Sequence, residues 1–332
     1  MRDYCPKVRN EPTLLDDVSL SVREYNEHTR VEEGMGRVSK GDNVMSVKNV
    51  IKLIADSTSD LPNHWIKQYD IGIVPLYVTL GGQTYKDTLE ITTAELYRRV
   101  EEEGTIPKTA APSPADFYRI FEPEISAGKN ILYISMSSKV SSTNQNAHIA
   151  AREFPAGRVH IVDSMHLSAS YALLVIRAAR ALEAGQPLNE VIGDIENVRE
   201  KVKIEILVDR LDYLHKGGRV TSLQHLIGNV LKVRPVLNIV KGEVRSVQKY
   251  RGKMEKALEP ILQKVVSQKN RICPNLVIIG QMLAEKMAER VRSHLLDHIH
   301  FKEVAVIEGG CAIGSHTGPN TIAVSYLLKG SV

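Results

Sequence analysis

The 332-residue sequence is poor in cysteine, with three residues at positions 5, 273 and 311 and no C-x-x-C pair. So few and so widely separated thiols exclude a disulfide framework and indicate a reducing compartment. Long apolar runs are also absent, because segments such as Tyr171–Ile176 fall far short of the ~20 residues that span a bilayer. No apolar run follows basic residues near the N-terminus, as a secretory signal requires. We therefore expect a cytoplasmic protein with at most transient membrane contact.

Aromatic residues are also few, and neither positive nor negative charge is in large excess. Aromatics make up 5% of the chain, with Trp65 the single tryptophan, and 43 Lys and Arg against 39 Asp and Glu leave a net charge of +4. Neither a strongly basic surface nor a base-stacking platform is indicated, so we expect no nucleic-acid partner. The 43% hydrophobic content is ordinary for a globular protein, and the length favours about two domains.

Several signatures of catalytic and cofactor sites are missing. The sequence has no G-x-x-x-x-G-K-[ST] loop, no G-x-G-x-x-G after a strand, no H-E-x-x-H and no G-x-S-x-G. His294, His298 and His300 lie close enough for a metal site on a helix face, but a solvated helix end is the better interpretation. We expect no metal and no cofactor.

The chain divides into three parts. Residues 1–48 mix charged and polar residues and end in a glycine-rich stretch, so we expect a poorly ordered extension. From residue 49 strands and helices alternate up to residue 164, which predicts a doubly wound parallel sheet. Residues 165–332 mix hairpin and crossover signals, which predicts a second α/β domain with a mixed sheet. The fold class is therefore α/β, with two domains.

The expected elements follow from apolar patterns and their turn residues. In the first domain the strands are Val50–Ala55, Ile71–Leu80, Asn130–Ser135 and Arg158–Asp163, and the helices Thr93–Glu103, Pro114–Ile125 and Ser141–Glu153. In the second domain the strands are Ile204–Val208, Val236–Val240, Gly242–Gln248, Asn275–Gly280 and Glu303–Glu308.

Hydroxyl-rich clusters stand at the ends of the first domain's strands or at the starts of its helices. They are Asp56–Thr58, Lys108–Pro114, Ser135–Thr143 and Asp163–Ser164. Taken singly, each is a helix cap. Parallel strands bring their carboxyl ends to one sheet edge, however, and hydroxyls with helix N–H groups bind anions there. Because Lys108 and Lys139 are the cations present, a carboxylate fits these clusters better than a polyphosphate.

Two further segments stand out in the second domain. Leu214–Val220 carries Gly217, Gly218 and Arg219, which we place in a turn. Ile313–Asn320 contains a glycine-flanked His316, which we place in a turn between a strand and a last helix. A histidine in a Ser/Thr/Gly loop is a better site candidate than one on a helix, but spacing alone leaves its role open.

Together these segments resemble the DegV family of fatty-acid-binding proteins, and in particular the acyl-binding, FakB-type subunits of bacterial fatty acid kinases. The resemblance extends from Val50 to Leu328. The segments that carry it are Asp56–Pro62, Thr109–Pro114, Ser137–Ala147, Val162–Ser164, Leu214–Thr221, Lys232–Leu237 and Gly314–Pro319. The sequence departs from the family pattern at Ala110, Ala111, Ser142 and Asn144.

The resemblance implies a long-chain fatty acid in an apolar tunnel of the first domain, with its carboxylate on Thr109 and Ser141. It implies that Arg251 and His316 are basic residues near the head group, on the surface that faces the kinase. Further candidate site residues are Ser57, Ser142, Gly217, Gly218 and Arg219.

On this interpretation the chain has no catalytic residue of its own. A partner kinase transfers a phosphoryl group from ATP to the carboxylate, giving an acyl phosphate for bacterial phospholipid synthesis. Two alternatives stay open. One is a stand-alone lipid-sensing regulator that contacts its partner through the segment from Gly217 to Arg219. The other is an acyl- or phosphoryl-transfer enzyme that uses Ser141 or His316 in the same cleft.

Overall fold

The computed structural model describes residues 51–221 and 233–330, so the predicted extension 1–48 lies outside the described residues. Residues 51–329 belong to one compact unit. The division near residue 164 therefore stays a prediction. None of the helices in the described ranges is both long and apolar enough to cross a membrane.

The first part of the chain forms a four-stranded sheet in which all strands are parallel. Its order is β2 (Gly72–Val74), β1 (Ile51–Asp56), β6 (Asn130–Ser135) and β7 (Val159–Asp163). The central strands β1 and β6 consist mostly of apolar residues and are buried along most of their length. That composition is typical of a parallel sheet covered on both faces.

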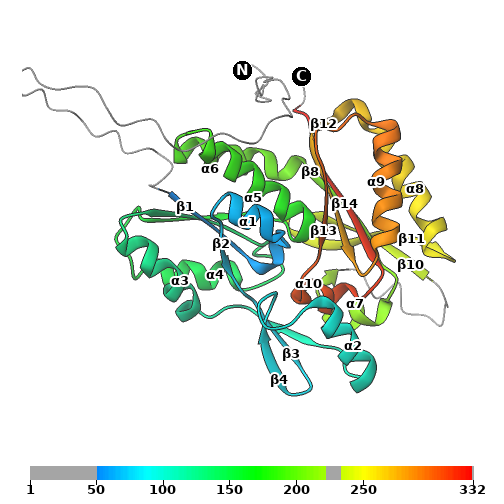
Figure 1. Ribbon diagram of the computed structural model, residues 1–332, viewed down its shortest axis with the longest axis horizontal. Coiled ribbons are helices and arrows are strands. Elements are labelled where there is room, and N and C mark those ends of the chain that lie inside the picture. The colour runs from blue at the N-terminus through cyan, green and yellow to red at the C-terminus, as the bar shows by residue number, and fades with distance from the viewer. Residues whose placement is uncertain (1–50, 222–232, 331–332) are drawn as a thin grey trace, which may run out of the picture. The chain divides into compact units, whose positions relative to one another are not determined.

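Helices cover both faces of this sheet, so the predicted doubly wound arrangement is confirmed (Figure 1). On one face lie α3 (Pro114–Ser126) and α4 (Thr143–Ala151), and the phenylalanines of α3 pack against Tyr133. On the other face lie α1 (Asn63–Gln68) and α5 (Ser168–Glu183), within the largest apolar core.

A small antiparallel sheet follows β2, where one continuous strand over Ile71–Leu80 was expected. The chain is instead broken at Pro75, and β3 (Tyr77–Leu80) leaves the parallel sheet to pair with β4 (Gln83–Lys86) and β5 (Lys108–Ala110). Proline has no backbone N–H to donate to a strand ladder, which fits a break between the two sheets at this residue. Helix α2 (Thr93–Glu103) connects β4 to β5 and ends at Gly104.

The second part forms the predicted mixed sheet. Its order is β13 (Val304–Glu308), β12 (Ile272–Met282), β14 (Thr321–Leu328), β8 (Val202–Leu207), β10 (Val233–Val240), β11 (Glu243–Arg251) and β9 (Val220–Thr221). Helices α8 (Met254–Ser267) and α9 (Glu285–His298) cover one face, while α5 contacts β8, β12 and β14. The buried helix α5 therefore packs against both large sheets.

The expected turns of the second part are helices. Residues Leu211–Gly217 form α7, which ends at Gly218 in the left-handed conformation (φ 62°). Residues Cys311–Thr317 form α10, so His316 lies on a helix, and the last element is β14 rather than a helix. Helix α6 (Leu188–Val198) joins α5 to β8 through one turn of 3₁₀ helix.

Candidate functional site

A cavity of about 600 Å³ lies between the carboxyl ends of β1 and β6, the β5 strand, helix α10 and the second sheet. Its apolar lining comprises Leu76, Ala110, Ala111, Met136, Val140, Leu167, Ile206, Leu214, Val220, Leu237, Val244, Ala312 and Ile313. Its polar lining comprises Thr58, Thr109, Ser138, Lys139, Ser141, Ser142, Asn144, Gln145, Arg219, His316 and Thr317. Among the described residues no acidic side chain lines it. A volume of this size suits a small organic ligand.

The wall comes from both parts of the chain. Residues beyond 165 supply more than half of the apolar lining, including Leu237 and Val244 from the β10–β11 hairpin. The resemblance placed the ligand within residues 49–164, whereas the cavity lies between the parallel sheet and the second sheet. Helix α5 contacts strands of both sheets, including β1, β8, β12 and β14.

Asp56 organises the edge of the parallel sheet at the cavity. Its buried carboxylate accepts hydrogen bonds from the Thr58 amide at 3.2 Å, the Met136 amide at 2.9 Å and the Tyr133 hydroxyl at 3.0 Å. These bonds connect the end of β1 to the end of β6. Burial raises the pKa of Asp56, while the hydrogen bonds from the Thr58 hydroxyl and the Met136 amide act in the opposite direction. Asp56 is a structural anchor for the loops that carry the lining hydroxyls.

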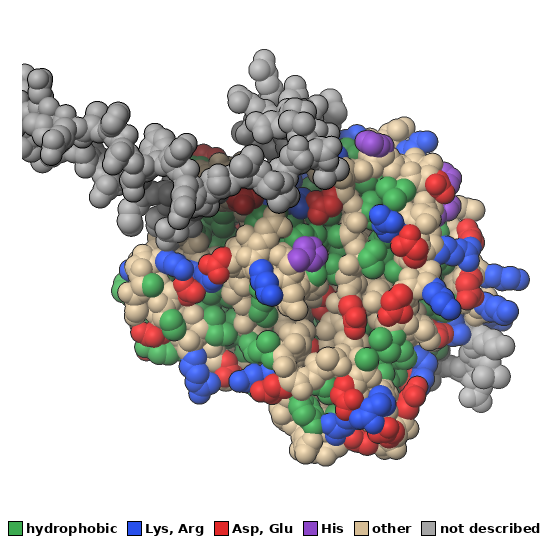
Figure 2. Space-filling view, viewed as in Figure 1, with side chains coloured by type: hydrophobic (Ala, Val, Ile, Leu, Met, Phe, Trp, Pro, Cys, Tyr) green, Lys and Arg blue, Asp and Glu red, His purple; other side chains and the backbone are tan. Residues whose placement is uncertain are grey.

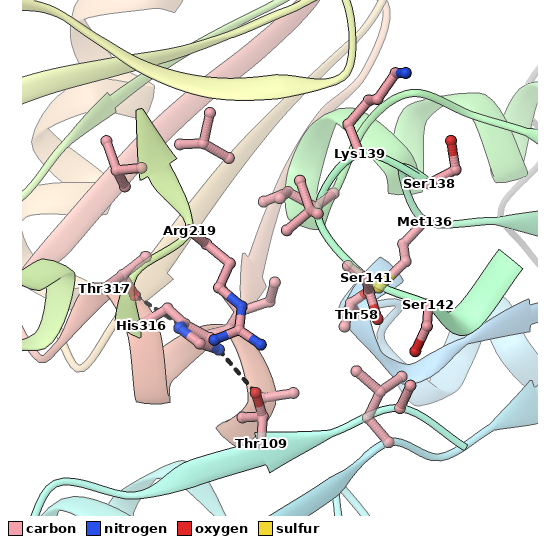
Figure 3. Close-up of a pocket in the computed structure, with 18 of the residues that line it drawn as sticks. Thr58, Thr109, Met136, Ser138, Lys139, Ser141, Ser142, Arg219, His316 and Thr317 are labelled. Carbon is pink, nitrogen blue, oxygen red and sulfur yellow. Dashed lines mark hydrogen bonds between the residues drawn. The ribbon is translucent and has the colours of Figure 1, made fainter. Parts of the chain in front are cut away.

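Ser141 precedes α4, which begins at Thr143. Its hydroxyl lies 2.8 Å from the Thr143 hydroxyl and accepts a hydrogen bond from the Thr143 amide at 3.3 Å. This local bond places Ser141 at the helix start, where unpaired N–H groups favour an anion. Figure 3 shows Ser141, Ser142 and Thr58 on one side of the cavity, and Thr109, His316 and Arg219 on the other.

Thr109 and His316 form a direct hydrogen bond across the junction of β5 and α10. The Thr109 Oγ1 lies 2.8 Å from His316 Nε2, and the buried Nδ1 of His316 has no hydrogen-bond partner among the described residues. Burial lowers the pKa of His316 to about 4, and the nearby Arg219 acts in the same direction. With this pKa the His316 ring is uncharged at neutral pH, and its predicted place near the head group stays a prediction.

The remaining predicted residues lie outside the cavity lining. Ser57 is buried and donates to Asp87 Oδ2 at 2.7 Å, while Gly217 packs so closely on His316 that a Cβ would lie 2.5 Å from its Nδ1. Gly218 ends α7, and Arg251 is exposed at the last residue of β11. Thus Thr109, Ser141, Ser142, Arg219 and His316 meet at one cavity. Their roles in binding stay predictions.

Two residues that position α10 were missed at the sequence level. Asp60 Oδ1 accepts from the Gly310 amide at 2.8 Å, and Asp87 Oδ1 accepts from the Ala312 amide at 3.1 Å. Both carboxylates thus bind N–H groups at the start of the helix that carries His316. Asp60 lies in the segment Asp56–Pro62 without a role assigned to it, and no local pattern marks Asp87 in its loop after β4.

The β10–β11 hairpin contacts the loop between β6 and α4. Its two-residue turn has positive φ at Lys241 (50°) and Gly242 (83°), and Ser137 Oγ donates to the Gly242 carbonyl at 2.7 Å. A Cβ on Gly242 would lie 2.7 Å from Ser137 Oγ. This contact holds Leu237 and Val244 against the far side of the cavity.

Gly242→Ala is expected to lower the free energy of unfolding by roughly 2 kcal/mol, because backbone strain and the collision with Ser137 add together. Gly185→Ala is the matched control: its φ of 78° is close to that of Gly242, but a Cβ there meets open space, so it should cost less. Urea unfolding of both variants measures the difference. Equal losses would show that the Ser137 contact contributes nothing.

Within the described residues no metal site forms at His294, His298 and His300. The rings of His294 and His298 stack on α9 with centroids 4.4 Å apart, and His298 Nδ1 bonds to the His294 carbonyl at 2.8 Å. Within residues 51–221 and 233–330, no cluster of three His, Cys, Asp or Glu side chains could hold a metal ion.

Comparison with known proteins places the chain in a family. The model of the DegV family of uncharacterised proteins matches residues 50–329. A DegV domain-containing protein of Caldanaerobacter subterraneus subsp. tengcongensis is 30% identical over 279 residues, which cover 84% of this chain and 99% of the relative.

Solved structures agree with this assignment. A DegV family protein of Thermus thermophilus, described for its fatty acid binding, is 34% identical with a TM-score of 0.79, covering 84% of this chain and 99% of that one. A Thermotoga maritima protein whose structure is described as revealing a fatty acid binding function is 29% identical with a TM-score of 0.74, at coverages of 84% and 99%. The chain belongs to the DegV family.

Proposed function

We propose that this chain binds a long-chain fatty acid in the 600 Å³ cavity, with the carboxylate near Thr109 and Ser141 and the acyl chain along the apolar lining. One observation carries the proposal: hydroxyl groups and apolar side chains share one cavity that no described acidic residue lines. The fatty acid binding described for the Thermus thermophilus and Thermotoga maritima relatives supports it.

The energetics suit such a ligand. Fifteen buried methylenes at ~0.8 kcal/mol each give roughly 12 kcal/mol as a gross upper bound, from which binding entropy is subtracted. The acyl chain therefore supplies most of the affinity, and the head group needs only a few hydrogen bonds to be oriented. Hydroxyl donors orient a carboxylate without neutralising it, which leaves it able to react.

Arg219 is one of the two cations that line the cavity. Its guanidinium points toward His316 and Thr109 in Figure 3, and its Nη1 donates to the Gly217 carbonyl at 2.9 Å. Lys139 is the other cation of the lining. Arg251 lies apart from the cavity lining, so in this proposal it acts in partner contact rather than in head-group binding.

The bound acid is presented to a partner kinase. A carboxylate oxygen attacks the γ-phosphorus of ATP, the bond to the bridging oxygen of ADP breaks, and an acyl phosphate forms for phospholipid synthesis. In this proposal the chain itself holds no cofactor and binds no nucleic acid. Basic and acidic side chains are interspersed on the face in Figure 2, which favours neither nucleic acid nor lasting membrane contact.

Catalysis by the chain alone is less well supported. A serine nucleophile needs a base within hydrogen-bond reach and a third group that orients the base. Ser141 bonds to Thr143 rather than to a histidine, and Nδ1 of His316 has no described partner.

Native mass spectrometry of the purified protein, followed by denaturing extraction, tests the ligand class. We expect a bound mass that matches a long-chain fatty acid. An empty protein that also fails to take up oleate or palmitate would overturn the proposal. Acyl phosphate formation with ATP and candidate kinase subunits then separates a presenting subunit from a lipid-sensing regulator.

Thr109→Val is expected to weaken fatty-acid binding about tenfold, because the head group loses one hydrogen bond worth roughly 1–2 kcal/mol. Displacement of a fluorescent fatty acid measures the change. Thr79→Val is the control, because Thr79 lies in the neighbouring strand β3 and bonds to Thr84 at 2.9 Å instead of lining the cavity. An unchanged affinity in Thr109→Val would remove Thr109 from the head-group site.

A further inference from the structure

Strand β13 forms one edge of the seven-stranded sheet (Figure 1). It pairs in parallel with β12 from Val304 to Glu308, and no other strand of the described residues pairs with it. In a parallel ladder, alternate residues direct their N–H and C=O groups to the same side. The Glu303 carbonyl accepts from the Val277 amide, so the odd-numbered residues of β13 face β12. The backbone groups of Val304, Val306 and Glu308 therefore point outward from the sheet.

Exposed apolar side chains accompany this free edge. Val306 is 42% exposed, and Leu296 of α9 is 43% exposed. Helix α9 contacts α8 through the ion pair of Arg290, so its opposite flank lies toward β13. Glu285 projects from that flank, where it contributes with burial to raising the pKa of Glu308. Leu296 lies about three helical turns further along the same flank.

Two side chains of opposite charge stand at equal distances from the centre of β13. Lys302 precedes Ala305 by three residues, and Glu308 follows it by three. Both are exposed and neither forms an ion pair with a described residue, whereas Glu303 is engaged by Arg180 at 2.6 Å. Charges on an edge strand oppose self-association where like charges would meet. At this edge an antiparallel second copy brings unlike charges together, which stabilises the pair.

We propose that β13 is a dimerisation strand, which pairs in antiparallel orientation with β13 of a second copy of this chain about a two-fold axis at Ala305. Val304 then lies opposite the partner's Val306, and their outward-facing N–H and C=O groups bond across the axis. By the same symmetry Lys302 meets the partner's Glu308 at both ends of the contact. The two seven-stranded sheets become one continuous sheet.

A second copy suits this edge because one register satisfies both the backbone and the charges. Hydrogen bonds form only where outward-facing residues oppose each other. The next such register, with its axis at Val306, sets Val304 opposite the partner's Glu308 and leaves Lys302 without an acidic partner. The contact comprises one short strand and one flank of α9, less than the ~20–30 residues a side of a standard interface. We therefore expect a dissociation constant on the order of 10 µM.

A charge swap tests the proposal, measured by sedimentation velocity over a range of protein concentrations. Lys302→Glu and Glu308→Lys should each raise the dissociation constant about tenfold, because like charges then meet at both ends. The variant that carries both substitutions should return to within about threefold of the wild-type value, since each new charge again faces its opposite. Lys256→Glu is the matched control: it changes the net charge equally, but Lys256 is exposed on α8, and this variant should dimerise as the wild type does.

A cysteine at the axis provides a second test that does not depend on charge. Ala305 is partly exposed and lies opposite the partner's Ala305 in a non-hydrogen-bonded pair, whose Cα atoms are ~4.5 Å apart, within the range of a disulfide. Mild oxidation of Ala305→Cys should give a covalent dimer on non-reducing electrophoresis. The wild type controls for the three native cysteines, and Ala115→Cys, at an exposed position of α3, controls for random collision.

The proposal is overturned if the wild-type protein stays monomeric at about 0.5 mM, where a dissociation constant near 10 µM leaves few monomers. It is also overturned if Lys302→Glu dimerises like the wild type, if the double variant fails to regain the dimer, or if Ala305→Cys forms no more covalent dimer than its controls. No residue of β13 lines the cavity, so Lys302→Glu should bind fatty acid with wild-type affinity. Fatty-acid binding by the wild type decides the proposed function separately.

Discussion

Replacing Asp87 with alanine is expected to lower the free energy of unfolding by about 3 kcal/mol. The buried carboxylate accepts hydrogen bonds from the Ser57 hydroxyl at 2.7 Å and the Ala312 amide at 3.1 Å, and also from the Cys311 amide. Alanine leaves the two amide N–H groups without acceptors in the interior, away from water. It also releases the start of α10, so the Thr109–His316 bond and ligand binding should weaken together.

Asp87→Asn is the variant that isolates this explanation. An asparagine keeps one carbonyl oxygen for the α10 amides, so it should retain most of the stability that alanine loses. Urea unfolding and fatty-acid displacement measured on both variants make the comparison. If asparagine destabilises the protein as much as alanine does, the hydrogen bonds to α10 are not the cause.

The difference in unfolding free energy between Asp87→Asn and wild type should change with pH in a known direction. Burial raises the pKa of Asp87 above its ordinary value of 3.8, so between that value and the raised one the folded protein binds more protons than the unfolded chain. The contribution of this carboxyl group to stability therefore decreases as the pH rises. The free energy of unfolding of Asp87→Asn relative to wild type should accordingly increase as the pH rises above 3.8.

The convergence of the polar clusters could be predicted from the sequence because it follows from the parallel sheet alone. The expected strands Val50–Ala55 and Asn130–Ser135 match β1 and β6 within one residue. Once these strands are parallel neighbours, the loops after Asp56 and Ser135 must lie at one edge. The structure places Thr58, Ser141 and Ser142 there, in one cavity.

Helix α10 could not be predicted because tertiary contacts induce it. Its sequence, Cys-Ala-Ile-Gly-Ser-His-Thr, is rich in residues that disfavour helices. Asp60 and Asp87 compensate by accepting its first N–H groups, yet they lie more than 220 residues away in the sequence. For the same reason the position of the cavity was not predictable, since its apolar lining brings residues such as Leu167, Ile206 and Ile313 together only after folding.

Acidification from pH 7 to pH 4 is expected to destabilise the protein through two buried histidines. Burial lowers the pKa of His166 and that of His316 to about 4 each, from an ordinary value of 6.5. His166 is 4% exposed, its Nε2 lies 2.8 Å from the Arg199 carbonyl, and its Nδ1 has no described partner. Both rings are therefore held neutral in the folded protein.

The direction of this pH effect follows from the number of protons that the folded and unfolded states bind. Between pH 6.5 and pH 4 the unfolded chain protonates its histidines and the folded protein does not, so the free energy of unfolding falls as the pH falls. A difference of 2.5 pKa units corresponds to about 3 kcal/mol for the fully buried His166, and to less for the partly exposed His316. The buried Asp56, Asp60 and Asp87 have raised pKa values and oppose this trend.

Glutamine variants separate the histidine contribution from that of the acids. Glutamine can bond to the Arg199 carbonyl or to Thr109 but takes up no proton, so His166→Gln and His316→Gln should each flatten the dependence of unfolding free energy on pH between 6.5 and 4. His148→Gln, at an exposed position on α4, should leave it as in wild type. Urea unfolding at several pH values tests this: if the free energy of unfolding of His166→Gln and His316→Gln depends on pH as steeply as that of His148→Gln, neither of the two rings is held neutral.

Because His316 bonds to Thr109, its loss should also weaken fatty-acid binding at neutral pH, whereas the loss of His166, which does not line the cavity, should not.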